Sequence, residues 1–139
     1  MKEKHLTAHM KVAHTYAGLS YCNRKQVGCV IVKDDRIVSI GYNGTPAGWD
    51  NCCETADNKT HNYVYHAEEN AILKLAGSHE SGHGATFFIT CAPCIKCAKM
   101  IATLEPEAVY YGEEYKNMDG VEHLRLRKIK TIIMKDTGE

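Results

Sequence analysis

One histidine motif and one cysteine motif constrain this chain more than any other feature. The first is HAE, beginning at His66, and the second is PCIKC, whose cysteines are Cys94 and Cys97. Imidazole and thiolate are good zinc ligands, and a catalytic zinc site uses three protein ligands where a structural site uses four. We therefore predict a catalytic zinc site with His66, Cys94 and Cys97 as ligands. Glu68 is the predicted catalytic acid and base.

Both motifs are predicted to open helices. Residues 66–76 carry apolar side chains at helical spacing before Gly77, and residues 93–104 repeat this pattern. Pro93 is expected in the first turn of the second helix. Cys94 and Cys97 then lie three residues apart on one helix face, where the positive end of the helix dipole favours thiolates.

Each part of the pattern also has a simpler interpretation. A Cys-x-x-Cys pair occurs as a redox pair or as half of a structural zinc site. His66 alone could be a core histidine, and Glu68 alone a solvated acid in a first helical turn. A non-catalytic zinc-binding module is therefore an alternative, but it needs a fourth protein ligand and has no need of Glu68. The complete set, in this order, favours catalysis.

The full pattern H-x-E…P-C-x-x-C resembles the zinc-dependent cytidine-deaminase superfamily. The resemblance implies a hydrolytic deamination in which Glu68 moves protons between a water molecule and a nucleobase. It also implies that the backbone amide of Ala67 and the carbonyl of Cys91 orient the base. Tyr115 would stack on the pyrimidine, or it caps the core, as aromatic residues more often do.

The segment of residues 41–54, GYNGTPAGWDNCCE, indicates which branch of this superfamily the chain resembles. It resembles deoxycytidylate (dCMP) deaminases, which implies conversion of dCMP and water to dUMP and ammonia. Asn43 would then bind the sugar, although an Asn-Gly pair also occurs simply as a turn. The alternatives are a tRNA-adenosine deaminase or a cytosine, guanine or free-nucleoside deaminase. Free cytidine deaminases typically have a cysteine at the position of His66.

The same resemblance implies regulation and assembly. Many dCMP deaminases are homohexamers that dCTP activates and dTTP inhibits, often with Mg²⁺, and the predicted effector contacts are Lys25, Asn43, Gly44 and Glu54. Residues 23–26 are either a phosphate contact or a solvated basic loop. Some members also carry a second, structural zinc ion, for which the candidate ligands here are Cys22, Cys52, Cys53 and His61.

Composition limits the class of partner. The 17 basic and 17 acidic residues balance, whereas proteins that grip long polynucleotides carry a basic excess. We expect a small nucleotide substrate and neither a nucleic-acid nor a membrane partner. The N-terminus has no apolar signal segment, so we expect a cytoplasmic protein. Its seven cysteines are then expected as metal ligands or thiols rather than disulfides.

The order of the predicted elements indicates the fold class. Helical spacing predicts helices at residues 2–19, 66–76, 93–104 and 121–129, and apolar runs predict strands at residues 27–32, 36–42, 85–90, 108–112 and 131–134. A hairpin followed by alternating helices and strands predicts a five-stranded mixed sheet with helices on its faces. We expect one α/β domain over residues 1–139, the three-layer α/β/α cytidine-deaminase-like fold.

Overall fold

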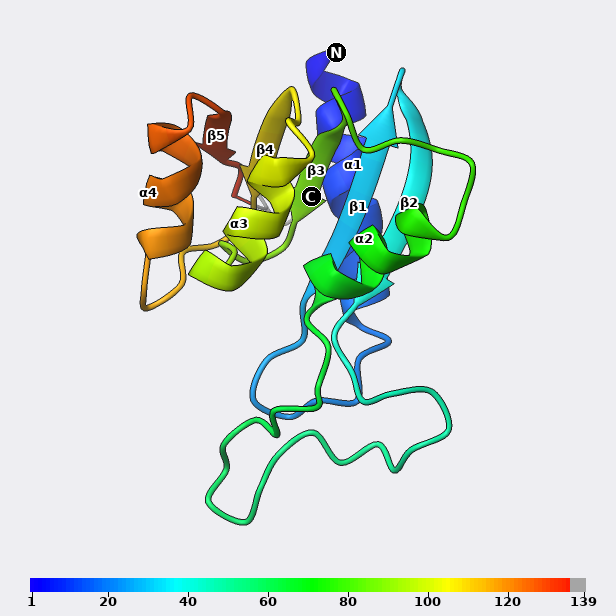
Figure 1. Cartoon of the computed structure of the whole chain (residues 1–139), viewed down its shortest axis with the longest axis vertical. Helices are drawn as coiled ribbons and strands as arrows, with labels where there is room; N and C mark the ends of the chain where they lie inside the picture. The colour runs from blue at the N-terminus through cyan, green and yellow to red at the C-terminus, as the bar shows by residue number, and fades with distance from the viewer. Residues whose placement is uncertain (136–139) are drawn as a thin grey trace.

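Five strands form a mixed sheet in the order β2-β1-β3-β4-β5 in the computed structural model, which describes residues 1–135 (Figure 1). Strand β1 pairs antiparallel with β2 and with β3, whereas β3, β4 and β5 are parallel. The predicted five-stranded mixed sheet is therefore confirmed. The strands are β1 (Gly28–Lys33), β2 (Arg36–Tyr42), β3 (Thr86–Ile89), β4 (Ala108–Tyr111) and β5 (Lys130–Ile133).

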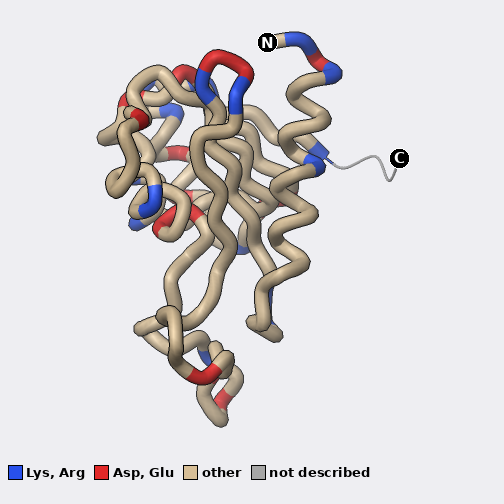
Figure 2. Tube along the Cα trace, turned by 90° about the vertical axis from the view of Figure 1, so that its right-hand side faces the viewer, with Lys and Arg blue, Asp and Glu red and all other residues tan. Residues whose placement is uncertain are grey.

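Helices cover both faces of this sheet and make the fold three-layered. Helix α1 (Glu3–Ala17) lies along one side, as the view turned by 90° in Figure 2 shows. Helices α2 (Ala67–Ala76), α3 (Ile95–Thr103) and α4 (Asp119–Leu126) lie on the opposite side, in front of the sheet in Figure 1. Acidic and basic residues are interspersed along the trace in Figure 2.

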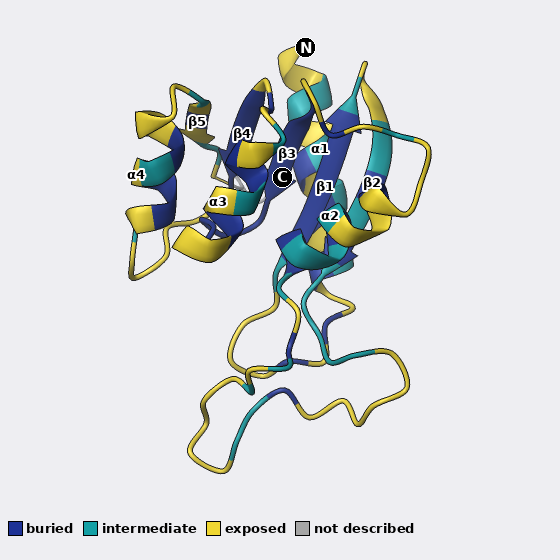
Figure 3. Ribbon diagram, viewed as in Figure 1, coloured by how far each residue is buried: buried dark blue, intermediate teal, exposed yellow. Residues whose placement is uncertain are grey.

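The side chains of the strands alternate between the two faces of the sheet and form a separate hydrophobic core on each face. Successive strand side chains point to opposite faces, so neighbours in one strand enter different layers. Ile31 and Phe87 pack with α2 and α3, whereas Val30 and Phe88 pack with α1. These strands are the buried centre of the molecule in Figure 3. The sheet is thus a rigid platform for the helices that carry the two motifs.

The helix starts differ slightly from the prediction. His66 and Cys94 are the N-cap residues of α2 and α3, both with extended backbone (φ −74°, ψ 158° and φ −71°, ψ 168°). Pro93 therefore precedes the cap instead of occupying the first turn. The consequence is local: Cys94 is outside the helix and Cys97 is inside it.

Two long connections have no helix or strand of their own. Residues 18–27 join α1 to β1, and residues 43–66 join β2 to α2; the second extends below the sheet in Figure 1. A disulfide between Cys22 and Cys53, with an S–S distance of 2.07 Å, joins the two connections. This corrects the expectation that the cysteines would avoid disulfides, because the fold brings these two side chains together.

No helix within residues 1–135 combines the length and the apolar character needed to span a bilayer.

Candidate active site

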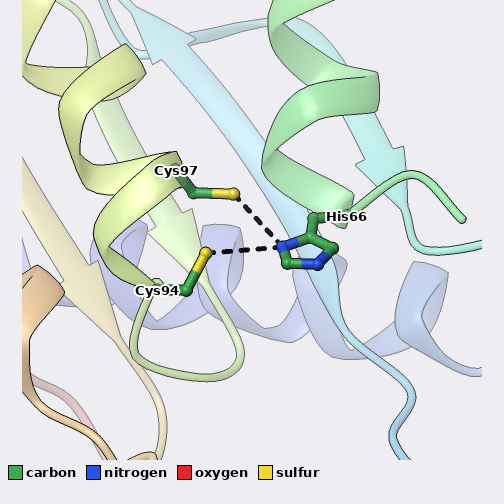
Figure 4. Close-up of side chains that lie close together, drawn as sticks. All are labelled: His66, Cys94 and Cys97. Atoms are coloured by element: carbon green, nitrogen blue, oxygen red, sulfur yellow. Dashed lines mark hydrogen bonds between the residues drawn. The ribbon is translucent and has the colours of Figure 1, made fainter. Parts of the chain in front are cut away.

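The predicted ligands converge at the N-termini of α2 and α3. The Nδ1 atom of His66 lies 3.5 Å from Sγ of Cys94 and 3.4 Å from Sγ of Cys97. Figure 4 shows both sulfur atoms pointing toward the imidazole ring from one side. The three ligand atoms all lie within 4.8 Å of one another.

These separations fit zinc. With Zn–S bonds of about 2.3 Å and a Zn–N bond of about 2.0–2.1 Å, a tetrahedral site separates nitrogen from sulfur by about 3.5 Å. The donor set, one imidazole and two thiolates, is also one that zinc accepts. His66, Cys94 and Cys97 would therefore hold the ion through Nδ1 and two Sγ atoms, with a fourth position left for water.

Two glycines allow both helix starts to approach their supports closely. A Cβ atom on Gly41 in β2 would lie 2.4 Å from the carbonyl oxygen of Ala67. A Cβ atom on Gly120 in α4 would lie 2.1 Å from the carbonyl oxygen of Pro93. Both distances are far below van der Waals contact. The starts of α2 and α3 thus pack directly against the backbone of Gly41 and Gly120, and a larger side chain at either glycine would displace them.

Glu68 is buried beside the ligands. Its side chain belongs to the first turn of α2, and the residue is 4 % exposed. Burial raises the pKa of its carboxyl group to about 7, because desolvation penalises the charged form. A carboxyl group with this pKa can accept and release a proton near neutral pH, which is what general acid–base chemistry needs.

The pKa values of the two cysteines are shifted in opposite directions. The hydrogen bond from Cys97 lowers the pKa of Cys94 to about 3, and the same contact raises the pKa of the Cys97 thiol. The hydrogen bond to Cys94 also raises the pKa of His66. The lowered pKa of Cys94 favours its thiolate, the form in which cysteine binds metals.

Glu69 supports the histidine, a role that the sequence analysis missed. Its Oε1 atom accepts a hydrogen bond from the backbone N–H of His66 at 2.9 Å, and Lys96 approaches its Oε2 atom at 3.4 Å. An acid three residues after a helix N-cap is the usual partner in a capping box. That spacing is the sequence signal that would have identified Glu69.

A cavity of about 300 Å³ opens beside these ligands. All of the predicted site residues line it except Gly44 and Cys97; its lining also includes residues that were not singled out, among them Arg24, Val64, Glu114 and Lys116. Gly44 instead pairs with Tyr65 through two backbone hydrogen bonds of 3.1 and 2.8 Å. The structure therefore places two of the three candidate metal ligands, Glu68 and several basic residues around one space.

Asn43 and Lys25, two of the residues predicted to contact substrate or effector, both make contacts within the chain. Asn43 accepts a hydrogen bond from the N–H of Val27 at 2.8 Å and donates one to the carbonyl of Lys25 at 2.7 Å. The ammonium group of Lys25 lies 2.5 Å from the carboxylate of Glu113, and this hydrogen bond raises the pKa of Lys25. Lys25 is thus already paired with a carboxylate at the edge of the cavity.

The other predicted residues around the base have different surroundings. Ala67 is the first residue of α2, so its N–H has no acceptor within the helix. Cys91 is buried, and that burial raises the pKa of its thiol to about 11. Tyr115 is 38 % exposed at the cavity, so it is not a core cap.

Two of the candidate ligands for a second zinc ion form a disulfide with each other instead. Cys22 and Cys53 are bonded to each other, with the carboxylate of Glu54 nearby. The thiol of Cys52 is exposed and donates to the carbonyl of Glu54 at 3.2 Å, and His61 stacks on Tyr63. The four candidate ligands of a second zinc ion therefore do not come together as one set of four free donor groups in this structure.

This chain is similar to known proteins in both sequence and fold. A family model described as "Cytidine and deoxycytidylate deaminase zinc-binding region" matches residues 3–113. The deoxycytidylate deaminase of Saccharomyces cerevisiae is 37% identical over 116 residues, which cover 77% of this chain and 37% of the yeast protein. The deoxycytidylate deaminase of Mycobacterium phage D29 is 35% identical over 117 residues, covering 74% of this chain and 90% of the phage protein.

A solved structure is similar over nearly the whole chain. The dCMP deaminase of cyanophage S-TIM5, in complex with dCMP and dUMP, superposes with a TM-score of 0.94 and 41% identity. The alignment covers 96% of this chain and 99% of the cyanophage chain. The fold and the length of this chain therefore match those of the phage protein, whereas the chain spans well under half of the yeast protein.

Proposed function

Because this chain belongs to the family of cytidine and deoxycytidylate deaminases, we propose that it catalyses the hydrolytic deamination of dCMP to dUMP and ammonia. One observation carries the proposal. A single cavity is lined by two of the zinc ligands, His66 and Cys94, by the buried acid Glu68 and by cationic side chains that suit a phosphate. His66, Cys94 and Glu68 suit the reaction at the base of the nucleotide, and the cationic side chains suit its phosphate.

The reaction uses the site residues as follows. Zinc bound by His66, Cys94 and Cys97 would supply the Lewis acid that makes a water molecule nucleophilic at neutral pH. Glu68 accepts a proton from this water and delivers it to N3 of the cytosine ring as the oxygen attacks C4. The same carboxyl group then assists protonation of the amine that leaves as ammonia. One water is consumed, and the amino group is replaced by a carbonyl oxygen.

Backbone groups orient the base in this proposal. The N–H of Ala67 has no helical acceptor and donates to the carbonyl of the cytosine. The carbonyl of Cys91 accepts from the exocyclic amino group, and Tyr115 stacks on the ring at the open side. Hydrogen bonds of opposite direction on two sides of the ring would distinguish cytosine from uracil.

Arg24 and Lys116 are the proposed phosphate ligands. Both line the cavity and are exposed, and neither takes part in an ion pair within residues 1–135. Lys25, by contrast, is paired with Glu113. A guanidinium group and an ammonium group that are free of carboxylates are available for the charge of a nucleoside monophosphate. This division of roles supports a nucleotide rather than a free nucleoside as substrate.

We also propose that dCTP activates and dTTP inhibits the enzyme, with Mg²⁺ accompanying the triphosphate, and that it works as a cytoplasmic homohexamer without nucleic-acid partners. The resemblance of residues 41–54 to deoxycytidylate deaminases supports this. Lys25, Asn43, Gly44 and Glu54 remain the candidate effector contacts, and Asn43 remains a candidate sugar ligand. Sedimentation velocity and dCMP turnover with and without each triphosphate would test these points.

The substrate is tested by following product formation from zinc-loaded protein. Parallel reactions contain dCMP, deoxycytidine, dCTP or a tRNA anticodon stem, and released ammonia and the product base are quantified. Conversion of dCMP to dUMP supports the proposal. Activity on the RNA alone would assign the protein to the tRNA-editing branch and overturn it.

A further inference from the structure

The carboxylate of Glu54 is directed at the backbone of another segment. Its Oε2 atom accepts hydrogen bonds from the N–H groups of Asn23 at 3.0 Å and Arg24 at 3.2 Å. Glu54 lies about thirty residues later in the chain and directly follows the disulfide-bonded Cys53. One carboxylate oxygen thus receives two consecutive backbone N–H groups, an arrangement in which charge strengthens both hydrogen bonds.

The other end of the same segment is held by Asn43. Its side chain bonds the carbonyl of Lys25 and the N–H of Val27, at 2.7 and 2.8 Å. Two side chains from the connection between β2 and α2 therefore fix the backbone of residues 23–27 at both ends. These residues belong to no helix or strand, so side-chain contacts replace the hydrogen bonds of regular structure.

Arg24 lies between these two attachments. Its backbone N–H is bonded to Glu54, and the residue, which is exposed, is one of those that line the cavity. A long cationic side chain on a free loop loses conformational entropy when it binds a ligand, and this loss reduces affinity. A loop whose backbone is fixed before the ligand arrives loses less. The hydrogen bonds that Glu54 accepts would therefore affect the phosphate affinity without contact between Glu54 and the phosphate.

The direction of the Glu54 carboxylate also matters electrostatically. Glu54 lines the same cavity, and an unpaired carboxylate there would repel a phosphate. The two backbone N–H groups hold its charge toward residues 23 and 24. The Glu54 carboxylate thus lies close to the proposed phosphate site, but its charge is hydrogen-bonded to the backbone N–H groups of Asn23 and Arg24.

We propose that Glu54 is a positioning residue for substrate recognition: it fixes the backbone of Asn23 and Arg24 so that the Arg24 guanidinium meets the phosphate of a nucleoside monophosphate. The proposal rests on the function proposed above. It differs from a direct effector contact, because it predicts an effect on the substrate when no triphosphate is present.

The test compares three variants in steady-state assays without effectors, using dCMP and deoxycytidine as substrates. Glu54→Ala removes both hydrogen bonds, and Glu54→Gln keeps one neutral acceptor oxygen. Glu80→Gln is the matched control, because Glu80 is paired with Arg36 at 2.9 Å and does not line the cavity. Thermal unfolding of each variant reports whether the fold is kept.

The expected result is a split between KM and kcat. Loss of two charge-assisted hydrogen bonds raises KM for dCMP by about tenfold in Glu54→Ala, with kcat within about twofold. Glu54→Gln is intermediate, Glu80→Gln resembles the wild type, and kcat/KM for deoxycytidine changes by less than about twofold.

Two results would overturn the inference. An unchanged KM for dCMP, or an equal loss on both substrates, would each exclude positioning of a phosphate ligand. If the wild-type protein does not deaminate dCMP, the proposed function fails separately. Titration calorimetry with dCMP then still decides whether Glu54→Ala and Glu54→Gln weaken nucleotide binding relative to Glu80→Gln.

Discussion

The helix side and the loop side of the cavity are stabilised by different means. His66, Glu68 and Cys94 lie at helix N-termini that rest on a buried sheet, with backbone packed against Gly41 and Gly120. Arg24 and Asn43 lie in connections without helix or strand, which are held by side-chain hydrogen bonds and a disulfide. The comparison indicates that the groups proposed for chemistry are placed mainly by packing, and those proposed for recognition mainly by individual polar contacts.

The largest effect is expected from removing a metal ligand. Cys94→Ala should lose bound zinc and reduce turnover by at least about a thousandfold, because two protein ligands cannot form the three-ligand catalytic site. Cys52→Ala removes an exposed thiol outside the cluster and should keep its zinc. Metal analysis of the purified variants together with ammonia release measures both properties. Full zinc content in Cys94→Ala would place the ion elsewhere.

Glu68→Gln should separate metal binding from proton transfer. The amide keeps the shape of the side chain but cannot carry the proton, so turnover should fall by about 10²–10⁴-fold with zinc content unchanged. Stopped-time assays with dCMP and metal analysis on the same preparation provide the comparison. Wild-type turnover in this variant would remove Glu68 from the mechanism.

A backbone contact on the helix side should be costly to disturb. Gly41→Ala introduces a Cβ atom 2.4 Å from the carbonyl of Ala67 and should lower the free energy of unfolding by about 1–3 kcal/mol. Gly77→Ala is the matched change at the other end of α2, where the new Cβ meets its nearest neighbour at 3.6 Å. That variant should change stability by less than about 0.5 kcal/mol. Urea denaturation measures both values, and equal stabilities would contradict the close seating of α2.

Changes on the loop side should have smaller and more selective effects. Arg24→Ala or Lys116→Ala should raise KM for dCMP by about tenfold and leave kcat nearly unchanged, since each removes a phosphate contact made equally in the ground and transition states. Deoxycytidine, which has no phosphate, is the matched substrate. Equal losses on both substrates would show that these cations support the fold of the loop instead.

The sequence predicted the helix side better than the loop side, for a physical reason. Periodicity identified the sheet and helices, and the motifs with His66, Cys94 and Cys97 predicted side chains that the structure brings together, because regular structure turns sequence spacing into geometry. Two kinds of contact join distant segments without any repeating pattern: the hydrogen bonds that Glu54 accepts from the backbone of Asn23 and Arg24, and the Cys22–Cys53 disulfide. Such contacts depend on how the loops fold over each other. Even the start of the helix after Pro93 was predicted two residues too early, because the extended cap at Cys94 is a tertiary feature.

The most direct test of the account is the ratio of kcat/KM for dCMP to kcat/KM for deoxycytidine in the zinc-loaded wild-type protein. A cavity that joins deamination chemistry to a phosphate site predicts a ratio of at least about a hundred, which corresponds to roughly 3 kcal/mol of phosphate binding. A ratio near one would show that the helix side works without phosphate recognition by the loop side, and would contradict the assignment of dCMP as substrate.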